Sequence, residues 1–460
     1  MTETLVQAEA GQPRRSGHAG QPPGELCEAV LERVGGRAEA EVAVSRGRSA
    51  LTRFANSHIH QNVSEDHVNV RLRLVAGGRL ASASTNRADA EGIDRLVEGA
   101  LEAARLRPVD HGWPGLAPPA PAVDADRYDA ATRWADPRER AQVVADFVAA
   151  APGLAGAGYC ASGGGNLAFA NTADQRLEGR TSAATLDAIH RTPTADGMGW
   201  QAGTRLGELD GGRAGEIAAA KARTGSEPVD LEPGRYEVVL EPACVDDMLF
   251  FLLDGFSAKT HAEGRSFLRL GEAQFDPAVT LCDDVTHPDT NGLAFDAEGT
   301  PKRPLDLVVG GVPSALLHDR RTARQAGTES TGHGVVGGES FGPAALNPVL
   351  APGDRNPEEL VASMSRGLLV TDLWYTRVLD PKTSVVTGLT RNGTFLVEGG
   401  QVVAAVRNLR FTQSYAEALA PGRVLGVGSD LRLRPSGTLV PSLHLASWNF
   451  TGSVTSEAGP

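Results

Sequence analysis

The 460-residue sequence has few of the features that mark nucleic-acid-binding proteins. Aromatic residues make up only 5% of the chain, and acidic residues outnumber basic ones by 57 to 44, for a formal charge of −13. A surface without an excess of basic residues or stacking aromatic rings is a poor match for the negative backbone and flat bases of DNA or RNA. We therefore expect no direct contact with nucleic acid.

Long apolar segments and paired cysteines are also missing. No run of residues approaches the roughly 18 apolar positions of a membrane span, and residues 1–25 lack the apolar core of a secretory signal. Cys27, Cys160, Cys244 and Cys282 lie far apart and form no CxxC pair, which fits scattered thiols in a reducing compartment better than a disulfide framework. We expect a cytoplasmic protein that makes no contact with a membrane.

The composition points to a mixed fold with more than one domain. Glycine and proline are abundant, at 54 and 28 residues, which predicts many turns and an α/β (α+β) fold class. The polar segment 1–22 is typical of a disordered tail. We expect an N-terminal α/β domain at 23–226, with helices packed on an antiparallel sheet, and a β-rich C-terminal domain at 227–455.

Residue periodicity supports this arrangement. Alternation of apolar and polar residues predicts an antiparallel meander at 40–85 and further strands at 156–192. Helical spacing and capping residues predict helices at 24–36, 88–107, 136–153 and 212–223. In the second half, Pro242 is expected to open a helix that runs to Leu253 or slightly beyond, and the helix "NPEELVASMSRG" is expected to interrupt a series of short strands.

Two histidine-containing segments offer possible metal sites. His261 and Glu263 follow the predicted helix, but no second histidine lies a turn away, as a zinc helix of the HExxH type requires. His58 and His60 would lie on one face of a strand, about 6.5 Å apart, without an identifiable third ligand. Solvated loop and sheet residues are the better interpretation of both pairs.

Two further motifs carry little weight. Residues 332–337, "GHGVVG", match GxGxxG, but the "GESFGPAALNP" that follows is not expected to start a helix, so a dinucleotide site is rejected. A glycine-rich loop that a peptide backbone can approach remains open at this place. The sequence has no GxSxG elbow for nucleophilic catalysis.

Several blocks of the sequence resemble the TldD/PmbA (modulator of DNA gyrase) metallopeptidase family. They are "TESTGHGVVGGE", "NPEELVASMSRGLLVTDLWY", "VTGLTRNGTFLVEGGQVVAAVRNLRF" and "LRPSGTLVPSLHLASWNFTG", whose order and spacing match over roughly 230–452. The earlier "RFANSHIHQN", with the sheet and helix expected after it, fits the first domain of the family. The chain is similar in particular to the TldE (PmbA) branch, in an actinobacterial style. An acidic chain gives no support to the family's link with DNA gyrase.

The resemblance implies a cytoplasmic TldD–TldE dimer that cuts unfolded peptides. In that family the TldD-type subunit holds zinc through two histidines of an HExxxH helix and a later cysteine, and the TldE-type subunit lacks this set. Here the resemblance puts Phe256 and Thr260 roughly at the histidine positions, and the cysteine position falls within 433–436. None of these residues is a zinc ligand. We therefore expect no catalytic residue, metal ligand or cofactor in this chain, and zinc in a TldD-like partner.

The resemblance also suggests where an unfolded peptide would bind. An extended substrate can add as a strand at a sheet edge, held by backbone hydrogen bonds. The candidate segments are 328–338 and 387–396, and their candidate substrate-binding residues are Thr331, Gly332, His333, Gly334, Arg391 and Asn392. For "TRNGT" we favour the alternative of a hairpin turn, because Asn-Gly is a strong turn signal.

Three functions follow from these observations. The first is a TldE-like subunit of a zinc peptidase complex, itself without the zinc site. The second is a stand-alone metallopeptidase with a relocated metal site, for which His261, Glu263, Cys282 and His287 are the best-spaced ligands. The third is a non-catalytic homodimer that binds peptides. The sequence identifies neither the peptide nor the choice between a homodimer and a heterodimer.

Overall fold

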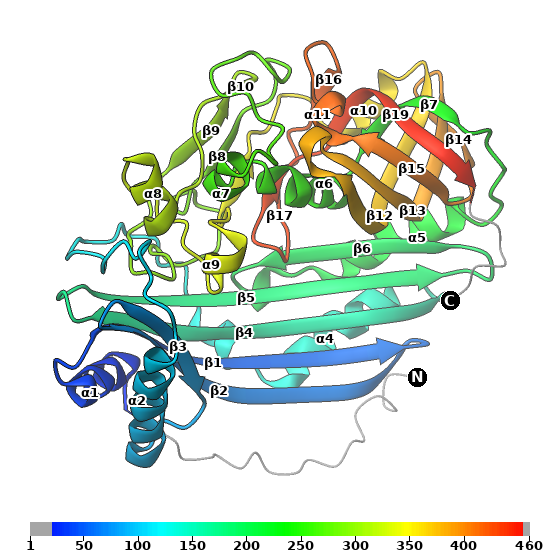
Figure 1. Ribbon diagram of the computed structural model, residues 1–460. Coiled ribbons are helices and arrows are strands. Elements are labelled where there is room, and N and C mark those ends of the chain that lie inside the picture. Colours follow the sequence, from blue (N-terminus) through cyan, green and yellow to red (C-terminus); the bar gives the residue numbers. More distant parts are fainter. Residues whose placement is uncertain (1–20, 454–460) are drawn as a thin grey trace.

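A computed structural model describes residues 21–453 of the chain, with the fold shown in Figure 1. It contains three β-sheets and a set of mostly short helices. This confirms the predicted mixed α/β fold class. Most of the predicted disordered tail lies outside the described residues, and the predicted domain boundary at 226–227 stays a prediction. No helix of the described part is long and apolar enough to cross a membrane.

The first sheet has six long antiparallel strands in the order β3–β2–β1–β4–β5–β6. Its strands are β1 (Glu39–Ala55), β2 (His58–Ala76), β3 (Arg79–Thr85), β4 (Ala155–Asn171), β5 (Arg176–Arg191) and β6 (Asp196–Gly203). The meander β1–β2–β3 is the one that the sequence predicted. The C-terminal half of the chain lies over one face of this sheet (Figure 1).

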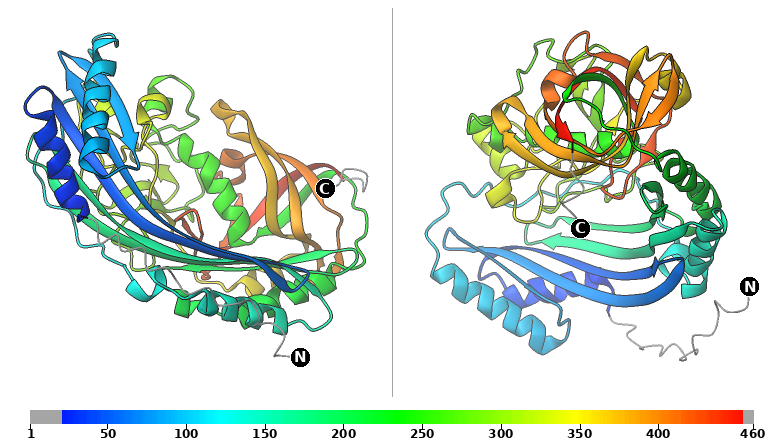
Figure 2. Two further views of the ribbon diagram at one scale, coloured as in Figure 1. Left: turned by 90° about the horizontal axis from the view of Figure 1, so that it is seen from below. Right: turned by 90° about the vertical axis from the view of Figure 1, so that its right-hand side faces the viewer.

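Strand alternation sends neighbouring side chains of the first sheet to opposite faces. In β1, β2, β4 and β5 the even-numbered residues face the helices, and Val42 and Val44 of β1 share one apolar cluster with α1 (Pro23–Val34) and α2 (Ala90–Arg105). In β3 and β6 the odd-numbered residues take this face. Residues of the opposite face, such as Phe169 of β4, face the C-terminal half of the chain, and Phe169 packs against Phe295. Helices and C-terminal half therefore cover opposite faces of one sheet (Figure 2).

Sequence-coded caps explain why these helices start where they do. The Asp89 side chain accepts a hydrogen bond from the Gly92 N–H at the start of α2, and Asp136 with Glu139 forms a capping box on α4 (Pro137–Ala149). Each cap satisfies backbone N–H groups that the first helical turn leaves unpaired. The predicted helices at 24–36, 88–107, 136–153 and 212–223 are confirmed, the last as α5 (Gly211–Thr224).

Glycines allow α5 to pack unusually close to β6. A Cβ atom on Gly199 would lie 2.0 Å from the carbonyl oxygen of Ala214, and one on Gly197 would lie 2.2 Å from that of Ala218. These contacts are with backbone, which cannot rotate away as a side chain can. Any larger residue must push the helix off the sheet.

We expect Gly199→Ala to lower the free energy of unfolding by about 2–3 kcal/mol, the usual cost of overpacking. Urea denaturation followed by circular dichroism measures this change. Gly207→Ala is the matched control, because a Cβ atom there meets no other atom within 4 Å. Equal stability of the two variants would show that α5 does not pack against β6 in this way.

The C-terminal half contains the other two sheets. The second sheet has the order β10–β9–β8–β11–β18–β17, with strands β8 (Leu281–Asp283), β9 (Leu305–Val309), β10 (Val312–Pro313), β11 (Pro348–Leu350), β17 (Arg432–Leu433) and β18 (Leu439–Val440). The third consists of β7 (Gly234–Leu240), β12 (Arg366–Asp380), β13 (Val385–Glu398), β14 (Gln401–Ala405), β15 (Leu409–Ser414), β16 (Val424–Val427) and β19 (Leu443–Ser453).

The third sheet closes on itself. Its order is β12–β7–β19–β15–β13, and β13 pairs again with β12, so these five strands form a small barrel, seen in the right-hand view of Figure 2. Side chains fill the interior of small barrels. Here Phe411, Tyr415 and Trp448 lie in the largest apolar cluster of the described chain, together with Met248 and Leu252 from α6 (Pro242–Asp254).

Short helices connect these strands. They are the α-helices α3 (Ala130–Arg133), α7 (Ala258–Ala262), α8 (Arg320–Ala326), α9 (Gly338–Phe341), α10 (Pro357–Ala362) and α11 (Tyr415–Ala418), and the 3₁₀ turns η1 (Leu206–Glu208) and η2 (Pro381–Thr383). The α9 turn corrects the expectation that no helix starts after "GHGVVG", although it is only one turn long. The predicted helix in "NPEELVASMSRG" is confirmed as the shorter α10.

Candidate functional site

The sequence resemblance directs attention to α6 and to residues 433–436, and the structure brings these two segments together. α6 begins at Pro242, whose missing N–H group costs nothing in a first helical turn. Most of its apolar side chains, such as Val245, Met248 and Leu252, face the core, and Asp246 and Asp247 are only partly buried. Asp246 points toward residues 434–436, which follow β17.

Asp246 makes two polar contacts with that segment. Its Oδ1 accepts a hydrogen bond from Oγ of Ser436 at 2.7 Å, and its Oδ2 lies 3.4 Å from Nε of Arg434. The two charged side chains are only 16% and 13% exposed. The helix and the loop are therefore tied by a partly desolvated ion pair and a hydrogen bond.

Arg434 also connects the C-terminal half with the first sheet. Its guanidinium carbon lies 3.7 Å from the ring centroid of Trp200 on β6, a cation–π contact. Figure 1 shows β17 reaching down to β6 at this place. Nη1 of Arg434 is buried and has no hydrogen-bond partner within the described chain. It is thus available to an acceptor oxygen of a bound molecule.

A second carboxyl group, Asp372 on β12, belongs to the same cluster. Its Oδ2 accepts a hydrogen bond at 2.9 Å from Nδ2 of Asn392, which also contacts the sulfur of Met198 on β6. Burial raises the pKa of Asp372 to about 7, against the lowering effect of Arg434 and of the Asn392 hydrogen bond. Burial likewise raises the pKa of Asp187 on β5, and Arg434 opposes that shift.

The raised pKa of Asp372 predicts a pH-dependent stability. A carboxyl whose pKa is higher in the folded state holds its proton more tightly there, so its contribution is present below pH about 4 and is lost as the pH rises to about 7. Asp372→Asn keeps a neutral acceptor for Asn392 at every pH. Between pH 5 and pH 8 we expect wild type to lose about 1–3 kcal/mol more stability than this variant.

Urea denaturation at both pH values measures this difference. The other buried carboxyls titrate in both proteins, so their contributions cancel when the variant is compared with wild type. Asp254→Asn replaces an exposed aspartate at the end of α6 and is expected to follow wild type. If Asp372→Asn shows the same change in unfolding free energy between pH 5 and pH 8 as wild type, the carboxyl of Asp372 is already ionised at pH 5. The cluster would then be open to water, and the prediction would be wrong.

Asp247 lies beside this cluster and has neutral partners. Its Oδ1 accepts a hydrogen bond at 2.6 Å from Oγ1 of Thr376, and its Oδ2 accepts one at 3.2 Å from the hydroxyl of Tyr415. Burial raises the pKa of Asp247 to about 6. Its hydrogen-bond partners are thus a threonine and a tyrosine, and neither is a base that could activate a nucleophile.

The residues at this place do not fit the zinc of a TldD-type subunit. Zinc sites are built from thiolates, imidazoles and carboxylates, and no three His, Cys, Asp or Glu side chains converge anywhere in residues 21–453. Asp246 is ion-paired, and its partner Arg434 adds a positive charge that repels a cation. No chemical step through a metal follows from this geometry.

The structure corrects the expected ligand positions. α6 ends at Asp254, so Phe256 lies buried in the turn beyond it and Thr260 lies on α7. Two residues outside the helix cannot take the place of a ligand pair on it. The α6 residue that contacts 433–436 is Asp246.

The relocated metal site is not assembled either. His261 and Glu263 are exposed, and Glu263 forms ion pairs with Lys259 and Arg265. Cys282 lies on β8, and the half-buried His287 accepts a hydrogen bond from the Asp289 N–H. These four potential ligands do not form one of the groups that a metal needs. His58 and His60 are exposed on β2, as expected.

Residues 331–334 lie in the interior. His333 is 0% exposed, with Nδ1 2.8 Å from Oγ1 of Thr331 and Nε2 3.3 Å from Oδ1 of Asp283. The Gly334 N–H donates to Oδ2 of Asp296 at 2.8 Å. Gly332 has φ +78, and a Cβ there would lie 2.9 Å from the carbonyl oxygen of Pro301. These contacts hold the segment in place, and its role in peptide binding stays a prediction.

Arg391 and Asn392 lie elsewhere, at the Asp372 cluster. The expected hairpin turn at "TRNGT" is wrong, because both residues belong to β13 and Asn392 adopts φ +57 in a bulge opposite β12. The guanidinium of Arg391 lies 4.2 Å from the ring centroid of Trp374. A groove of about 560 Å³ runs past Arg391, Asn392 and the 192–195 turn, so a peptide has room here.

Sequence reasoning missed Asp246, Arg434 and Asp372 as one site. One usable signal was a lone acid in the apolar run "LLVTDLWY", since a charged residue at an inward position of a strand needs a partner. Another was the pair of adjacent aspartates in an apolar helix. The contact between Asp246 and Arg434 could not be predicted in this way, because these two residues are 188 positions apart in the sequence and only the fold brings them together.

Comparisons with known proteins agree with this picture of the fold. A family model for "PmbA/TldA metallopeptidase domain 1" matches residues 40–104, and one for the "PmbA/TldA metallopeptidase C-terminal domain" matches residues 233–452. The second match contains both α6 and the 433–436 segment.

Curated relatives are more distant. A metalloprotease TldD homolog of Buchnera aphidicola is 24% identical over 258 residues, which cover 52% of this chain and 50% of that protein. A TldD homolog of Haemophilus influenzae is 25% identical over 170 residues, or 36% of this chain and 34% of that protein. The chain thus spans half the length, or less, of these curated relatives.

Solved structures match over almost the whole chain. TldE from Thermococcus kodakarensis superposes with a TM-score of 0.84 at 21% identity, covering 93% of this chain and 99% of that one. A putative modulator of a DNA gyrase from Thermotoga maritima gives a TM-score of 0.82 at 20% identity, with the same coverage. At such identities the likeness shows the fold alone.

Proposed function

Because the chain belongs to the PmbA/TldD metallopeptidase family, we propose that it is a TldE-like, non-catalytic subunit of a two-chain zinc peptidase. In this proposal a TldD-like partner holds the zinc, and the two chains together enclose an unfolded peptide in the cytoplasm. The Asp246–Arg434 contact carries the proposal. It joins the two segments to which the family resemblance assigns metal ligands, and it does so with an ion pair and a hydrogen bond.

Surface chemistry near the site supports a macromolecular partner. Four large apolar side chains of β12 are exposed, namely Trp374, Tyr375, Val378 and Leu379, and Phe250 of α6 is 73% exposed. β12 and α6 are directly linked by the Thr376–Asp247 hydrogen bond. We call these five residues the aromatic patch. Trp374 and Tyr375 lie against each other, with ring centroids 5.6 Å apart, and exposed large apolar residues of this kind are typical of interaction sites.

The proposal is tested by co-expression with a TldD-like chain that carries HExxxH. We expect the two chains to purify together, and we expect the complex to cut an unfolded peptide while this chain alone does not. The double variant Trp374→Ala/Tyr375→Ala should weaken the association at least about tenfold, as aromatic anchors at interfaces do. Leu106→Ala, an 84% exposed leucine just beyond α2, is the matched control.

Zinc-dependent hydrolysis by this chain alone would contradict the proposal. So would separate elution of the two chains on size-exclusion chromatography with light scattering. A homodimer that binds peptides without cutting them would favour the non-catalytic binding protein instead.

A further inference from the structure

A cavity of about 540 Å³ lies between the first sheet and the C-terminal half, away from the Asp246–Arg434 contact. Its floor is the odd-numbered face of the sheet, with Ala43, Leu167 and Phe169, and its roof comes from residues 292–302 and 334–336. Thr181 of β5 lines it, whereas Asp187 of the candidate site lies six residues further along the same strand, about 20 Å away. We call it the Arg71 cavity.

The walls of the Arg71 cavity are mainly apolar. Leu293, Phe295 and Val335 line it together with Phe169. Its volume lies in the range of pockets that bind small molecules, which bury most of an apolar ligand and orient it with a few polar groups. The polar groups of this cavity therefore decide what it can hold.

The first polar group is Arg71, a half-buried arginine of β2 without a carboxylate partner in the described chain. Its Nη2 donates a hydrogen bond to the carbonyl oxygen of Ala297 at 2.7 Å. Three acids lie nearby, and each is in direct contact with Arg73 instead: Glu41 at 2.6 Å, Glu298 at 3.0 Å and Glu339 at 3.2 Å. A guanidinium has five N–H donors, so most of those of Arg71 remain available.

The second polar group is Lys302, which is only 4% exposed. Its Nζ donates a hydrogen bond to Oδ1 of Asn347 at 3.0 Å and forms no ion pair with a described residue. Burial lowers the pKa of Lys302, while the nearby Asp283 and Asp296 oppose that shift. A second positive charge without a direct counter-ion thus borders the same cavity.

Asp296 is the one carboxyl among the residues that line the cavity. Its oxygens are occupied by backbone donors, the N–H groups of Glu298 and Thr300 at 2.9 Å and of Gly334 at 2.8 Å. Burial raises the pKa of Asp296 to about 7. It is therefore partly neutral at neutral pH and does not cancel the two cations.

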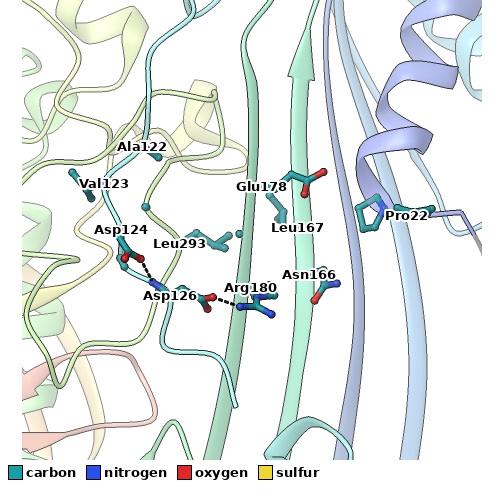
Figure 3. Close-up of a pocket in the computed structure, with 15 residues that line it drawn as sticks. Pro22, Ala122, Val123, Asp124, Asp126, Asn166, Leu167, Glu178, Arg180 and Leu293 are labelled. Carbon is teal, nitrogen blue, oxygen red and sulfur yellow. Dashed lines mark hydrogen bonds and ion pairs between the residues drawn. The ribbon is translucent and has the colours of Figure 1, made fainter. Parts of the chain in front are cut away.

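A neighbouring cavity has different chemistry. It measures about 320 Å³ and shares Leu293 and Leu167 with the Arg71 cavity (Figure 3). Its arginine, Arg180, is already ion-paired with Asp126, as the dashed line in Figure 3 shows. Unpaired cations beside apolar walls thus distinguish the larger cavity from the smaller one.

We propose that the Arg71 cavity binds a small amphipathic carboxylate, with its apolar body against Phe169, Leu293 and Phe295 and its head group held by Arg71 and Lys302. A charge-assisted hydrogen bond to a carboxylate in such a place is stronger than a neutral one. The ligand is either a free aryl-alkyl or alkyl acid or the C-terminal residue of a peptide, which present the same chemistry. The inference does not depend on the proposed peptidase role.

Isothermal titration calorimetry with 4-phenylbutyrate and 4-phenylbutan-1-ol on the full chain tests this inference. We expect the acid to bind at least about tenfold more tightly than the alcohol, the difference that a charge-assisted hydrogen bond supplies. Arg71→Met should weaken binding of the acid by a similar factor and leave binding of the alcohol unchanged. Arg53→Met, an exposed arginine of β1, is the matched control.

A second variant keeps the test independent of the arginine. Ala43→Leu leaves both cations in place and fills the cavity, so it should abolish binding of the acid. A hexapeptide ending in phenylalanine, with a free C-terminus or a C-terminal amide, separates the two ligand sources. Equal affinity for acid and alcohol, absence of binding, or binding of the acid that Ala43→Leu leaves unchanged would each overturn the proposal.

Discussion

Arg434→Ala is expected to lower the free energy of unfolding by about 3 kcal/mol, because removing one member of a buried ion pair leaves the other charge without a partner. Asp246 loses its counter-ion at 3.4 Å, and Trp200 loses the cation on its ring. Arg434 also lowers the pKa values of Asp187 and Asp372, so its removal leaves two further carboxyls in less favourable surroundings. Urea denaturation at pH 7 measures the loss.

The matched control is Arg432→Ala, which removes an exposed arginine two residues away. A surface substitution of this kind usually changes stability by less than about 0.5 kcal/mol. Comparable losses in the two variants would show that Arg434 does not tie α6 to the loop. A double-mutant cycle with Asp246→Ala would then give no coupling energy, whereas the described geometry predicts clear coupling.

Trp448→Ala is expected to cost about 3–5 kcal/mol, the usual range for truncating a buried tryptophan. Trp448 is 0% exposed and lies in the barrel, with ring centroids 5.4 Å from both Phe411 and Tyr415. A well-packed barrel interior cannot collapse onto the space that the indole leaves. Loss of the cooperative unfolding transition of the C-terminal half is the expected result.

Phe341→Ala is the control for this prediction, because Phe341 is an aromatic residue that is 74% exposed. It should change stability by less than about 0.5 kcal/mol. A small effect of Trp448→Ala would mean that the barrel interior is loosely packed, and the position of α6 against it would then be in doubt.

Local signals made most of the fold predictable. Asp136 identified the start of α4 because a cap acts within three residues of itself, and the helical spacing of Ile93, Leu96 and Val97 identified α2. Alternation of apolar and polar residues identified the strands of the first sheet, because successive side chains of a strand point to opposite faces of the sheet. The opening of α6 at Pro242 and its end near Leu253 were also predicted from local sequence.

Where local signals misled, a longer-range contact decided the outcome. Asn-Gly at 392–393 favours a hairpin turn, but β12 pairs with β13 on both sides of this step, through Arg391 and Thr394, and keeps the chain extended through a bulge. The barrel closure between β12 and β13 could not be inferred from periodicity, which does not report which strands pair. The position of His333 in the interior was hidden for the same reason.

The candidate site shows this limit most clearly. Asp246 and Arg434 are each unremarkable in sequence, and only the fold brings them together across 188 residues. The family resemblance identified both segments but assigned the ligand positions to Phe256 and Thr260, beyond the end of the helix. Only the folded chain shows that Asp246 is the α6 residue in contact with 433–436.

The central proposal is that an ion pair and a hydrogen bond join the two segments to which the sequence resemblance assigns metal ligands, and that this chain does no zinc chemistry by itself. Elemental mass spectrometry of the purified chain, with a peptide-hydrolysis assay on the same sample, tests it most directly. We predict far less than one zinc per chain and no cleavage. About one zinc per chain, with cleavage that a chelator abolishes, would contradict the account, because metal content and activity would then have a common site in this chain.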